Sequence, residues 1–125
     1  MDEVNELKVL YFEPGKKNPE IRVIEDTLSE KQKLVGGYIE PLYLDCGCVC
    51  ICNEEGLCNG MPVNRLVYPS GKESGEPAGI FGPFFVMMDD WTSYDEKVDL
   101  SNYIRSRDET FEYIRKILAQ KNAGR

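Results

Sequence analysis

The chain has 125 residues, of which 42% are hydrophobic, so it is long enough for one domain and apolar enough for a single core. Fifteen Lys and Arg against 22 Asp and Glu give a formal charge of −7, which argues against binding to duplex nucleic acid because cationic contacts supply most of that affinity. The chain has no histidine, which excludes a Ser-His-Asp triad, a Cys-His pair and every His-ligated metal site.

Targeting signals are missing from the sequence. No apolar run approaches the roughly 20 residues that span a bilayer, and the acidic N-terminus lacks the pattern of a signal peptide. Five cysteines, an odd number, favour free thiols over a disulfide framework. We therefore expect a cytoplasmic protein that does not associate with membranes.

The first third of the chain predicts a hairpin and a short helix. Residues 7–12 and 20–24 have the composition or the alternation of strands, and a long connection joins them. Thr27 and Glu30 form a capping-box pattern that starts a helix, and Gly36 with Gly37 stops it after about Val35.

The middle of the chain predicts further strands. Pro41 places its strand at an edge or a bulge, and the turn at 53–56 is expected to close a hairpin onto 57–61. A polar loop follows at 69–77, and the most apolar segment is expected to be a single core strand with a kink at Gly82-Pro83. The expected strands are residues 38–43, 46–52, 65–68 and 78–88.

The remainder predicts a C-terminal helical segment over about residues 95–120. Apolar residues recur there every three or four positions, and a second capping box at Ser106 and Glu109 predicts a break. The whole chain, residues 1–125, is therefore expected to be one α+β domain. Its mainly antiparallel sheet would carry one short helix and the C-terminal helical segment.

Five short motifs in a fixed order resemble a known family. They occupy residues 7–15, 34–40, 51–56, 59–65 and 78–81. Together they resemble the small domain-of-unknown-function 3846 family of Gram-positive bacteria, their phages and mobile elements, over about residues 7–90. The resemblance implies the fold and a mobile-element context, and it implies no activity. The run of four cysteines and the C-terminal helical segment depart from the family pattern.

The candidate binding site is the loop at residues 53–65, which holds three Asn, two Gly, two Glu, one Pro and one Arg. An Arg can clamp a phosphate or carboxylate, and side-chain amides on turns are common recognition groups. We expect a binding surface at Asn59, Gly60, Asn64 and Arg65, bordered by Glu54. The structural alternative is a turn at Asn59-Gly60, an Asn64 that bonds its own backbone, and an Arg65 paired with Glu54 or Glu55.

Cysteine occupies every second position from Cys46 to Cys52, so a strand would place these four thiols on one face. Neighbouring side chains on that face lie roughly 6–7 Å apart, which is too far for an undistorted disulfide. Packing as small apolar residues is the first interpretation. A soft-metal site or a redox pair, drawing also on Cys58, stays open.

These observations favour a non-enzymatic binding protein of a phage or mobile element, with counter-defence as a role suggested by context. Its partner would be a host protein or a small anionic ligand such as a nucleotide. No cofactor and no duplex nucleic acid are expected, and homo-oligomerisation stays open. The alternatives are a cysteine-based metal-thiolate or redox module, and a small histidine-free enzyme that uses Glu54, Glu55 or Asp89.

Overall fold

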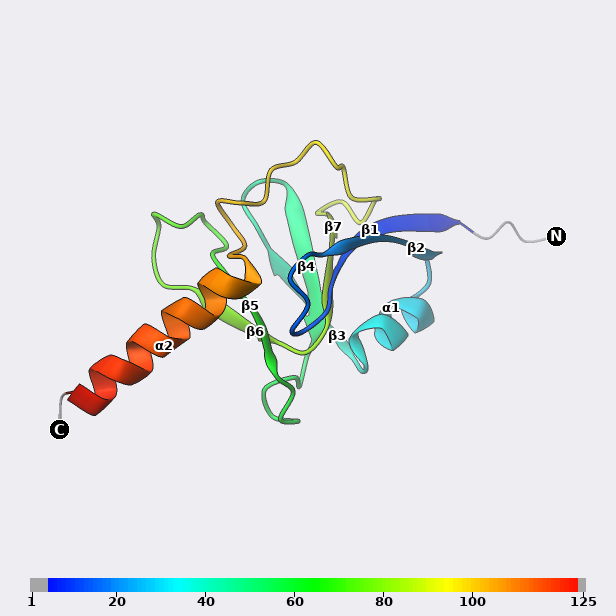
Figure 1. Cartoon of the computed structure of the whole chain (residues 1–125). Helices are drawn as coiled ribbons and strands as arrows, with labels where there is room; N and C mark the ends of the chain where they lie inside the picture. Colours follow the sequence, from blue (N-terminus) through cyan, green and yellow to red (C-terminus); the bar gives the residue numbers. More distant parts are fainter. Residues whose placement is uncertain (1–4, 124–125) are drawn as a thin grey trace.

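The computed structural model describes residues 5–123, which form two antiparallel sheets and two helices (Figure 1). The larger sheet has the strand order β2-β1-β7-β4-β3, and the smaller one pairs β5 with β6. The larger sheet consists of β1 (Glu6–Phe12), β2 (Glu20–Glu25), β3 (Ile39–Tyr43), β4 (Cys48–Asn53) and β7 (Phe84–Met88). The other elements are β5 (Val63–Val67), β6 (Ala78–Phe81), α1 (Leu28–Val35) and α2 (Arg107–Ala123). The predicted α+β fold is confirmed.

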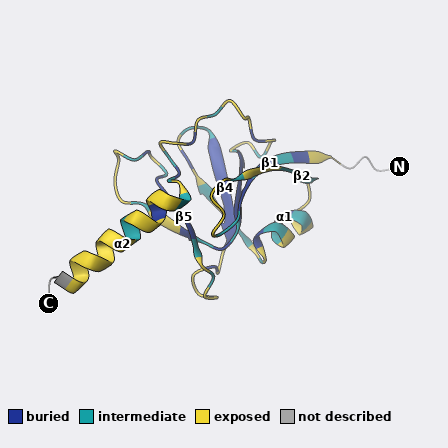
Figure 2. Cartoon of the chain, in the orientation of Figure 1, coloured by how far each residue is buried: buried dark blue, intermediate teal, exposed yellow. Residues whose placement is uncertain are grey.

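Both faces of the larger sheet are covered, and this explains why its central strands β4 and β7 are buried along almost their whole length. Figure 2 shows β4 in the buried colour. One face packs with Val35 of α1. The other packs against the β5–β6 pair and the segment before α2, through residues such as Ile80, Leu100 and Ile104.

The local signals of the N-terminal half are confirmed. The Thr27 hydroxyl accepts a hydrogen bond from the amide of Glu30 at 3.1 Å, and Gly36 ends α1 with a φ of 82°. This left-handed conformation is one that glycine adopts without a steric penalty. β3 lies at an edge of the sheet, where Pro41 removes no hydrogen bond that an interior strand would need.

Two strand predictions are wrong. The segment 78–88 forms two strands in different sheets, because Gly82 has a φ of 84° and its amide donates to the carbonyl of Pro62 at 2.8 Å. Residues 57–61 form turns instead of a strand paired with β4. The amides of Asn59 and Met61 bond back to Glu55 and Gly56.

The C-terminal helix starts later than predicted, at Arg107. The side chains of Asp95 and Asp99 accept hydrogen bonds from the amides of Lys97 and Ser101, at 3.0 and 2.9 Å. Such local bonds compete with helix formation. Within residues 5–123, neither helix has the length and apolar character needed to cross a membrane.

Candidate anion-binding site

The structure separates the residues of the predicted binding loop into an exposed group and a buried group. Glu54, Asn59 and Gly60 are exposed in the turns that follow β4, whereas Asn64 and Arg65 of β5 are only 0% and 1% exposed. Glu54 lines a pocket between β3, β4 and β6, and Arg65 lines a separate cavity. The five residues do not form one accessible surface, and Arg65 does not pair with Glu54 or Glu55.

Asn64 positions Arg65. Its side-chain amide donates to the carbonyls of Phe12 and Gly82 at 2.9 and 3.0 Å, which ties β5 to the end of β1 and to the junction of β6 and β7. Its Oδ1 accepts from Nη1 of Arg65 at 2.9 Å. The orientation of Asn64 is fixed by all three bonds, so the guanidinium of Arg65 is held in one place.

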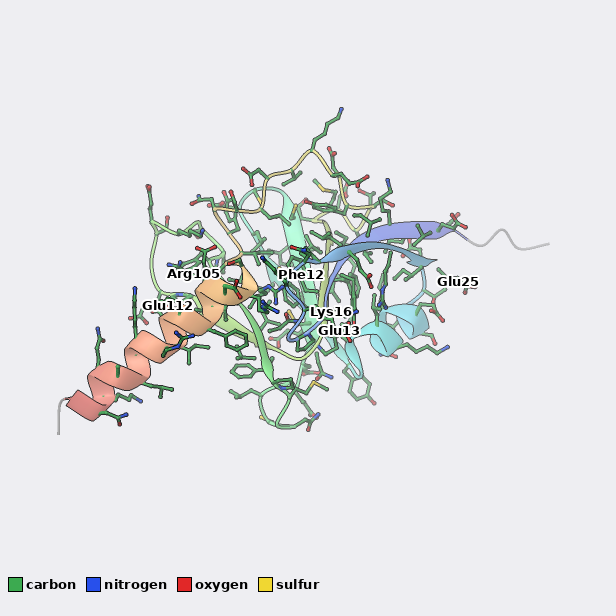
Figure 3. The ribbon with its side chains drawn as sticks, viewed as in Figure 1. Phe12, Glu13, Lys16, Glu25, Arg105 and Glu112 are labelled. Carbon is green, nitrogen blue, oxygen red and sulfur yellow. The ribbon has the colours of Figure 1, made fainter. Side chains whose placement is uncertain are left out.

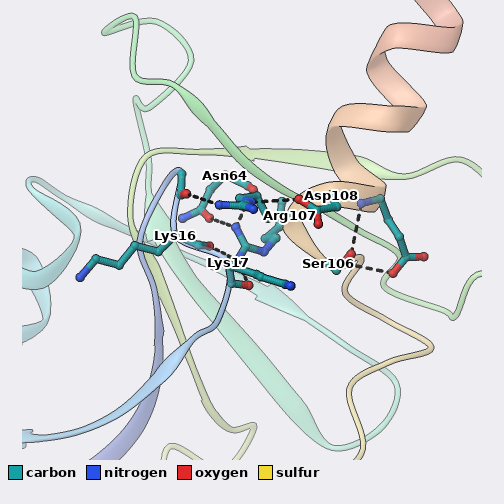
Figure 4. A network of polar contacts seen from close by, with 9 residues as sticks. Lys16, Lys17, Asn64, Ser106, Arg107 and Asp108 are labelled. Atoms are coloured by element: carbon teal, nitrogen blue, oxygen red, sulfur yellow. Dashed lines mark hydrogen bonds and ion pairs between the residues drawn. The ribbon is translucent and has the colours of Figure 1, made fainter.

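Arg65 is a buried cation whose hydrogen bonds all go to neutral oxygens of Asn64, Lys16 and Lys17, which are labelled in Figure 4. Nη1 also donates to the carbonyl of Asn64 at 3.0 Å, and Nη2 donates to the carbonyls of Lys16 and Lys17 at 2.7 and 3.2 Å. Among residues 5–123 it forms no ion pair with a carboxylate. Burial lowers the pKa of Arg65, the nearby charge of Arg107 lowers it further, and Asp108 acts in the opposite direction.

A second arginine holds the same connection. Nη1 of Arg107 donates to the carbonyl of Gly15 at 3.0 Å, and its Nε donates to Asp108 at 3.1 Å. The carbonyls of residues 15, 16 and 17 are therefore all held by guanidinium groups, one from the start of α2 and one from β5. This fixes the β1–β2 connection beside α2 and places Lys17 at the cavity.

The start of α2 is capped as predicted. The hydroxyl of Ser106 accepts from the amide of Glu109 at 3.1 Å, and the Glu109 carboxylate accepts from the amide of Ser106 at 3.3 Å. The hydrogen bond from Ser106 is the main reason why the pKa of Glu109 lies below its ordinary value. Glu109 is therefore ionised at neutral pH.

Arg105, immediately before the capping box, is held by aromatic rings as well as by charge. Its Nε donates to the Tyr68 hydroxyl at 2.9 Å, and its Nη1 donates to Glu109 at 3.3 Å. Its guanidinium lies 5.3 and 5.7 Å from the ring centres of Tyr68 and Tyr113. Figure 3 shows Arg105 at the start of α2 and Phe12 at the end of β1.

These elements line a cavity of about 290 Å³ that is open to the surface, which we call the Arg65 cavity. Its volume is at the lower end of the range of small-molecule pockets. The apolar part of the lining comes from β1 and from the segment before α2, and the polar part comes mainly from the β1–β2 connection, β5 and the start of α2. The full lining is Leu10, Phe12, Lys17, Asn18, Pro19, Arg65, Tyr94, Leu100, Ser101, Ile104, Arg105, Ser106 and Glu109.

The lining combines three cations with one carboxylate, in a protein whose overall charge is −7. Lys17, Arg65 and Arg105 can attract a phosphate or carboxylate, and Phe12 offers an aromatic ring next to them. The cavity contains neither histidine nor cysteine, and its one carboxylate stays ionised. The arrangement is thus suited to binding a small anion that carries an apolar or ring-shaped part.

Of the three cations in the lining, sequence reasoning named Arg65 as a candidate and did not name Lys17 or Arg105. Lys17 lies in an ordinary polar connection. No pattern in the sequence indicates that its own backbone carbonyl accepts a hydrogen bond from Arg65 of β5. Arg105 had one usable signal, because the capping box that follows it places it just before a helix.

The cysteines of β4 lie in the core. Cys48, Cys50 and Cys52 point to one face, as predicted, and pack in the same cluster as Phe84. Burial is the main cause that raises the pKa of Cys48 and Cys52 to about 12, and it raises the pKa of Cys50 well above its ordinary value. Within residues 5–123, no group of three or more His, Cys, Asp or Glu side chains is arranged to hold a metal ion.

A comparison with protein families gives a match. The model of the family described as a domain of unknown function, DUF3846, matches residues 7–110. This range contains both sheets except the first residue of β1, together with α1 and the first turn of α2. Neither the curated proteins nor the solved structures include a match to the chain.

Proposed function

The chain belongs to the DUF3846 family, and because that family is defined without a function, we propose one from the site: a non-enzymatic protein that binds a small organic anion in the Arg65 cavity. The ligand class is a phosphate or carboxylate attached to a ring or apolar group, of about the size of a mononucleotide. A host protein as partner, and a counter-defence role in a phage or mobile element, stay in the proposal as its biological context.

The observation that carries the proposal is the guanidinium of Arg65. A buried charge is costly unless it is paired, and its neutral hydrogen-bond partners leave the positive charge uncompensated. Arg107 adds a second positive charge nearby, and the one acidic group that acts on Arg65 in the opposite direction, Asp108, is itself paired with Arg107 at 3.1 Å. An anion in the cavity would supply the missing negative charge.

The shape and chemistry of the cavity support the same ligand class. The ring of Phe12 is stacked on Phe84 with centroids 4.6 Å apart and is 5% exposed, so it gives the lining of the cavity a rigid apolar edge. The guanidinium of Arg65 lies over the Phe12 ring, 5.4 Å from its centre, so charge and ring adjoin each other in the lining. A ligand with an anionic end and an apolar or ring-shaped part would contact both.

A thermal-shift titration tests the proposal. We expect AMP to raise the melting temperature of the protein in a concentration-dependent way, because a ligand that binds only the folded state stabilises it by mass action. Adenosine, which has the same ring system without the phosphate, is the matched ligand control and should give a much smaller shift. Inorganic phosphate tests the anionic end alone.

Two neighbouring lysines provide matched variants. Lys17→Ala removes a side chain that lines the cavity, and we expect it to weaken AMP binding about tenfold, which corresponds to about 1.4 kcal/mol. Lys16→Ala removes a side chain paired with Glu13 at 2.9 Å and should leave binding unchanged. Equal shifts with AMP and adenosine, or equal effects of the two lysine variants, would contradict anion recognition in this cavity.

A further inference from the structure

Three sulfur atoms lie together where β4 begins and β7 ends. Cys48 is the first residue of β4, and Met88, the last residue of β7, is its direct partner in the register of the two strands. Sγ of Cys48 lies 4.0 Å from Sδ of Met88. Cys46 packs in the same cluster, and its thiol lies within hydrogen-bond range of the Cys48 thiol. We call these three residues the sulfur cluster.

The turn between β3 and β4 holds the sulfur cluster in place. Gly47 lies between the two cysteines and has a φ of 88°, a left-handed conformation that glycine adopts without a steric penalty. Its carbonyl accepts a hydrogen bond at 2.9 Å from the amide of Asp89, which follows Met88. The backbone that carries Cys46 and Cys48 is therefore tied to the backbone that carries Met88.

The sulfur cluster is accessible from solvent through two of its members. Cys46 and Met88 are half-buried, whereas Cys48 is fully buried. A small ion that arrives from solvent meets the two outer sulfurs first, and the buried thiol then completes its ligands. None of the three residues lines the Arg65 cavity, so the sulfur cluster is a separate site.

The charges near the sulfur cluster are negative. Burial is the main cause that raises the pKa of Cys48 to about 12, the neighbouring Cys46 adds to it, and the carboxylates of Asp89 and Asp95 raise it further. Within residues 5–123, neither of these carboxylates forms an ion pair with a lysine or arginine. Their charge is therefore free to attract a cation to the sulfur atoms.

The ligand chemistry selects a soft ion. Thiolate and thioether sulfurs are ligands that Cu(I) prefers, whereas structural Zn²⁺ sites use four thiolate or imidazole ligands. No group of three His, Cys, Asp or Glu side chains among the described residues is arranged for a metal, so the third ligand here is the thioether of Met88. Sulfur ligands lie about 2.3 Å from a metal ion, so two of them in a trigonal arrangement are about 4.0 Å apart. Cys48 and Met88 already have this separation.

We propose that the sulfur cluster binds one Cu(I) ion through the thiolates of Cys46 and Cys48 and the thioether of Met88. The ion keeps its oxidation state, and each thiol releases its proton to solvent when it binds. The site takes up the soft-metal interpretation that the cysteine spacing left open and restricts it to the start of β4. It does not depend on the anion site, with which it shares no residue.

Anaerobic titration of the full chain with Cu(I), in competition with the chelator bicinchoninate, tests the site. We expect the protein to take about one Cu(I) per chain from the chelator. Met88→Leu keeps a similar packing volume and removes the thioether. Because loss of an outer-shell partner already costs about 10–100-fold in metal affinity, we expect this variant to bind Cu(I) at least about tenfold more weakly. Met87→Leu, which changes a side chain in the core cluster on the other face of the sheet, is the matched control and should bind like the unchanged protein.

The thiols are tested in the same assay. Cys46→Ser should weaken Cu(I) binding more than Met88→Leu does, because a thiolate brings a negative charge that a thioether lacks. Cys58→Ser changes an exposed thiol outside the sulfur cluster and should leave the affinity unchanged. Circular dichroism of each variant confirms that the fold is retained.

Three results would overturn the proposal. The first is an unchanged protein that leaves Cu(I) with the chelator. The second is equal affinity of Met88→Leu and Met87→Leu, which would mean that the thioether is not a ligand. The third is equal affinity of Cys46→Ser and Cys58→Ser, which would mean that the cysteines bind copper without regard to their position.

Discussion

At the scale of single residues, Arg65 is a part of the fold as well as the centre of the proposed site. We predict that Arg65→Met lowers the free energy of unfolding by about 2–4 kcal/mol, because several buried or partly buried oxygens lose their donor at once. The affected oxygens are the carbonyls of Lys16 and Lys17 and both oxygens of Asn64. Urea denaturation of the two proteins measures the difference.

Lys17→Ala is the control for this change. The Lys17 side chain is exposed and only its backbone carbonyl binds Arg65, so the variant should stay within about 0.5 kcal/mol of the unchanged protein. If both variants had the same stability, the hydrogen bonds of Arg65 would not contribute to the fold. The combination of a stable Lys17 variant and an unstable Arg65 variant is what makes Lys17 the better probe of binding.

The sequence indicated Arg65 as a candidate anion-binding residue but gave no indication that it is buried. Its fixed position after Pro62 was readable, because proline and asparagine define local geometry. Its partners were not readable, because the carbonyls of residues 16 and 17 are nearly fifty positions away. A buried arginine is uncommon, and its environment comes from tertiary packing that no local pattern records.

At the scale of elements, local patterns predicted the structure wherever the local interaction decides the outcome. The capping bonds at Thr27 and Ser106 and the glycine stop at Gly36 are of this kind. The predictions failed where the conformation or side-chain bonds of single residues interrupt a strand or a helix. Gly82 separates β6 from β7, and the side-chain bonds of Asp95 and Asp99 prevent the apolar spacing around Leu100 from forming a helix.

The turn after β4 gives a test at this scale. A Cβ on Gly56 would collide with the carbonyl oxygen of Phe81, which is backbone and cannot move aside easily. We predict that Gly56→Ala lowers the free energy of unfolding by more than about 2 kcal/mol. Gly60 has a φ of 71° but open space around it, so Gly60→Ala should cost about 1 kcal/mol. Thermal or urea denaturation that ranks Gly60→Ala as the worse variant would contradict this packing.

β4 predicts a dependence of stability on alkaline pH. Burial raises the pKa of Cys48 and Cys52 to about 12, from an ordinary value of 9.0 that the unfolded chain regains. The native protein thus keeps protons that the unfolded chain releases, and stability must fall as pH rises above about 9. Cys50→Val removes one such thiol, so its stability should fall less steeply between pH 8 and 10.5 than that of the unchanged protein. The urea midpoint at each pH measures both slopes, and equal slopes would contradict the raised pKa of Cys50.

At the scale of the whole molecule, the distribution of charge matters more than its sum. The chain has a charge of −7, yet the Arg65 cavity has three cations and one carboxylate in its lining. A small anion that enters the cavity meets the local positive field in a partly apolar environment, where such a field is strong. A large polyanion meets the acidic surface first.

Most cations around the cavity also cannot contact a partner whose surface is flat or convex. Arg65 is buried, Arg105 and Arg107 are paired with Glu109 and Asp108, and Lys16 is paired with Glu13. A DNA duplex needs a row of free cations on an accessible face, because its affinity comes from neutralising several phosphates together. A concave site with one exposed lysine offers a single phosphate group a place to bind and offers a duplex none.

We therefore predict that the protein does not bind duplex DNA at physiological salt, although we expect it to bind AMP. An electrophoretic mobility-shift assay with about 10 µM protein and a 30-base-pair duplex should show no retarded band at about 150 mM salt. The AMP titration on the same protein sample is the control that the site is folded and active. A retarded band that weakens as salt is raised would show that the paired arginines open to a larger polyanion, and the ligand class would then have to be widened from small anions to nucleic acid.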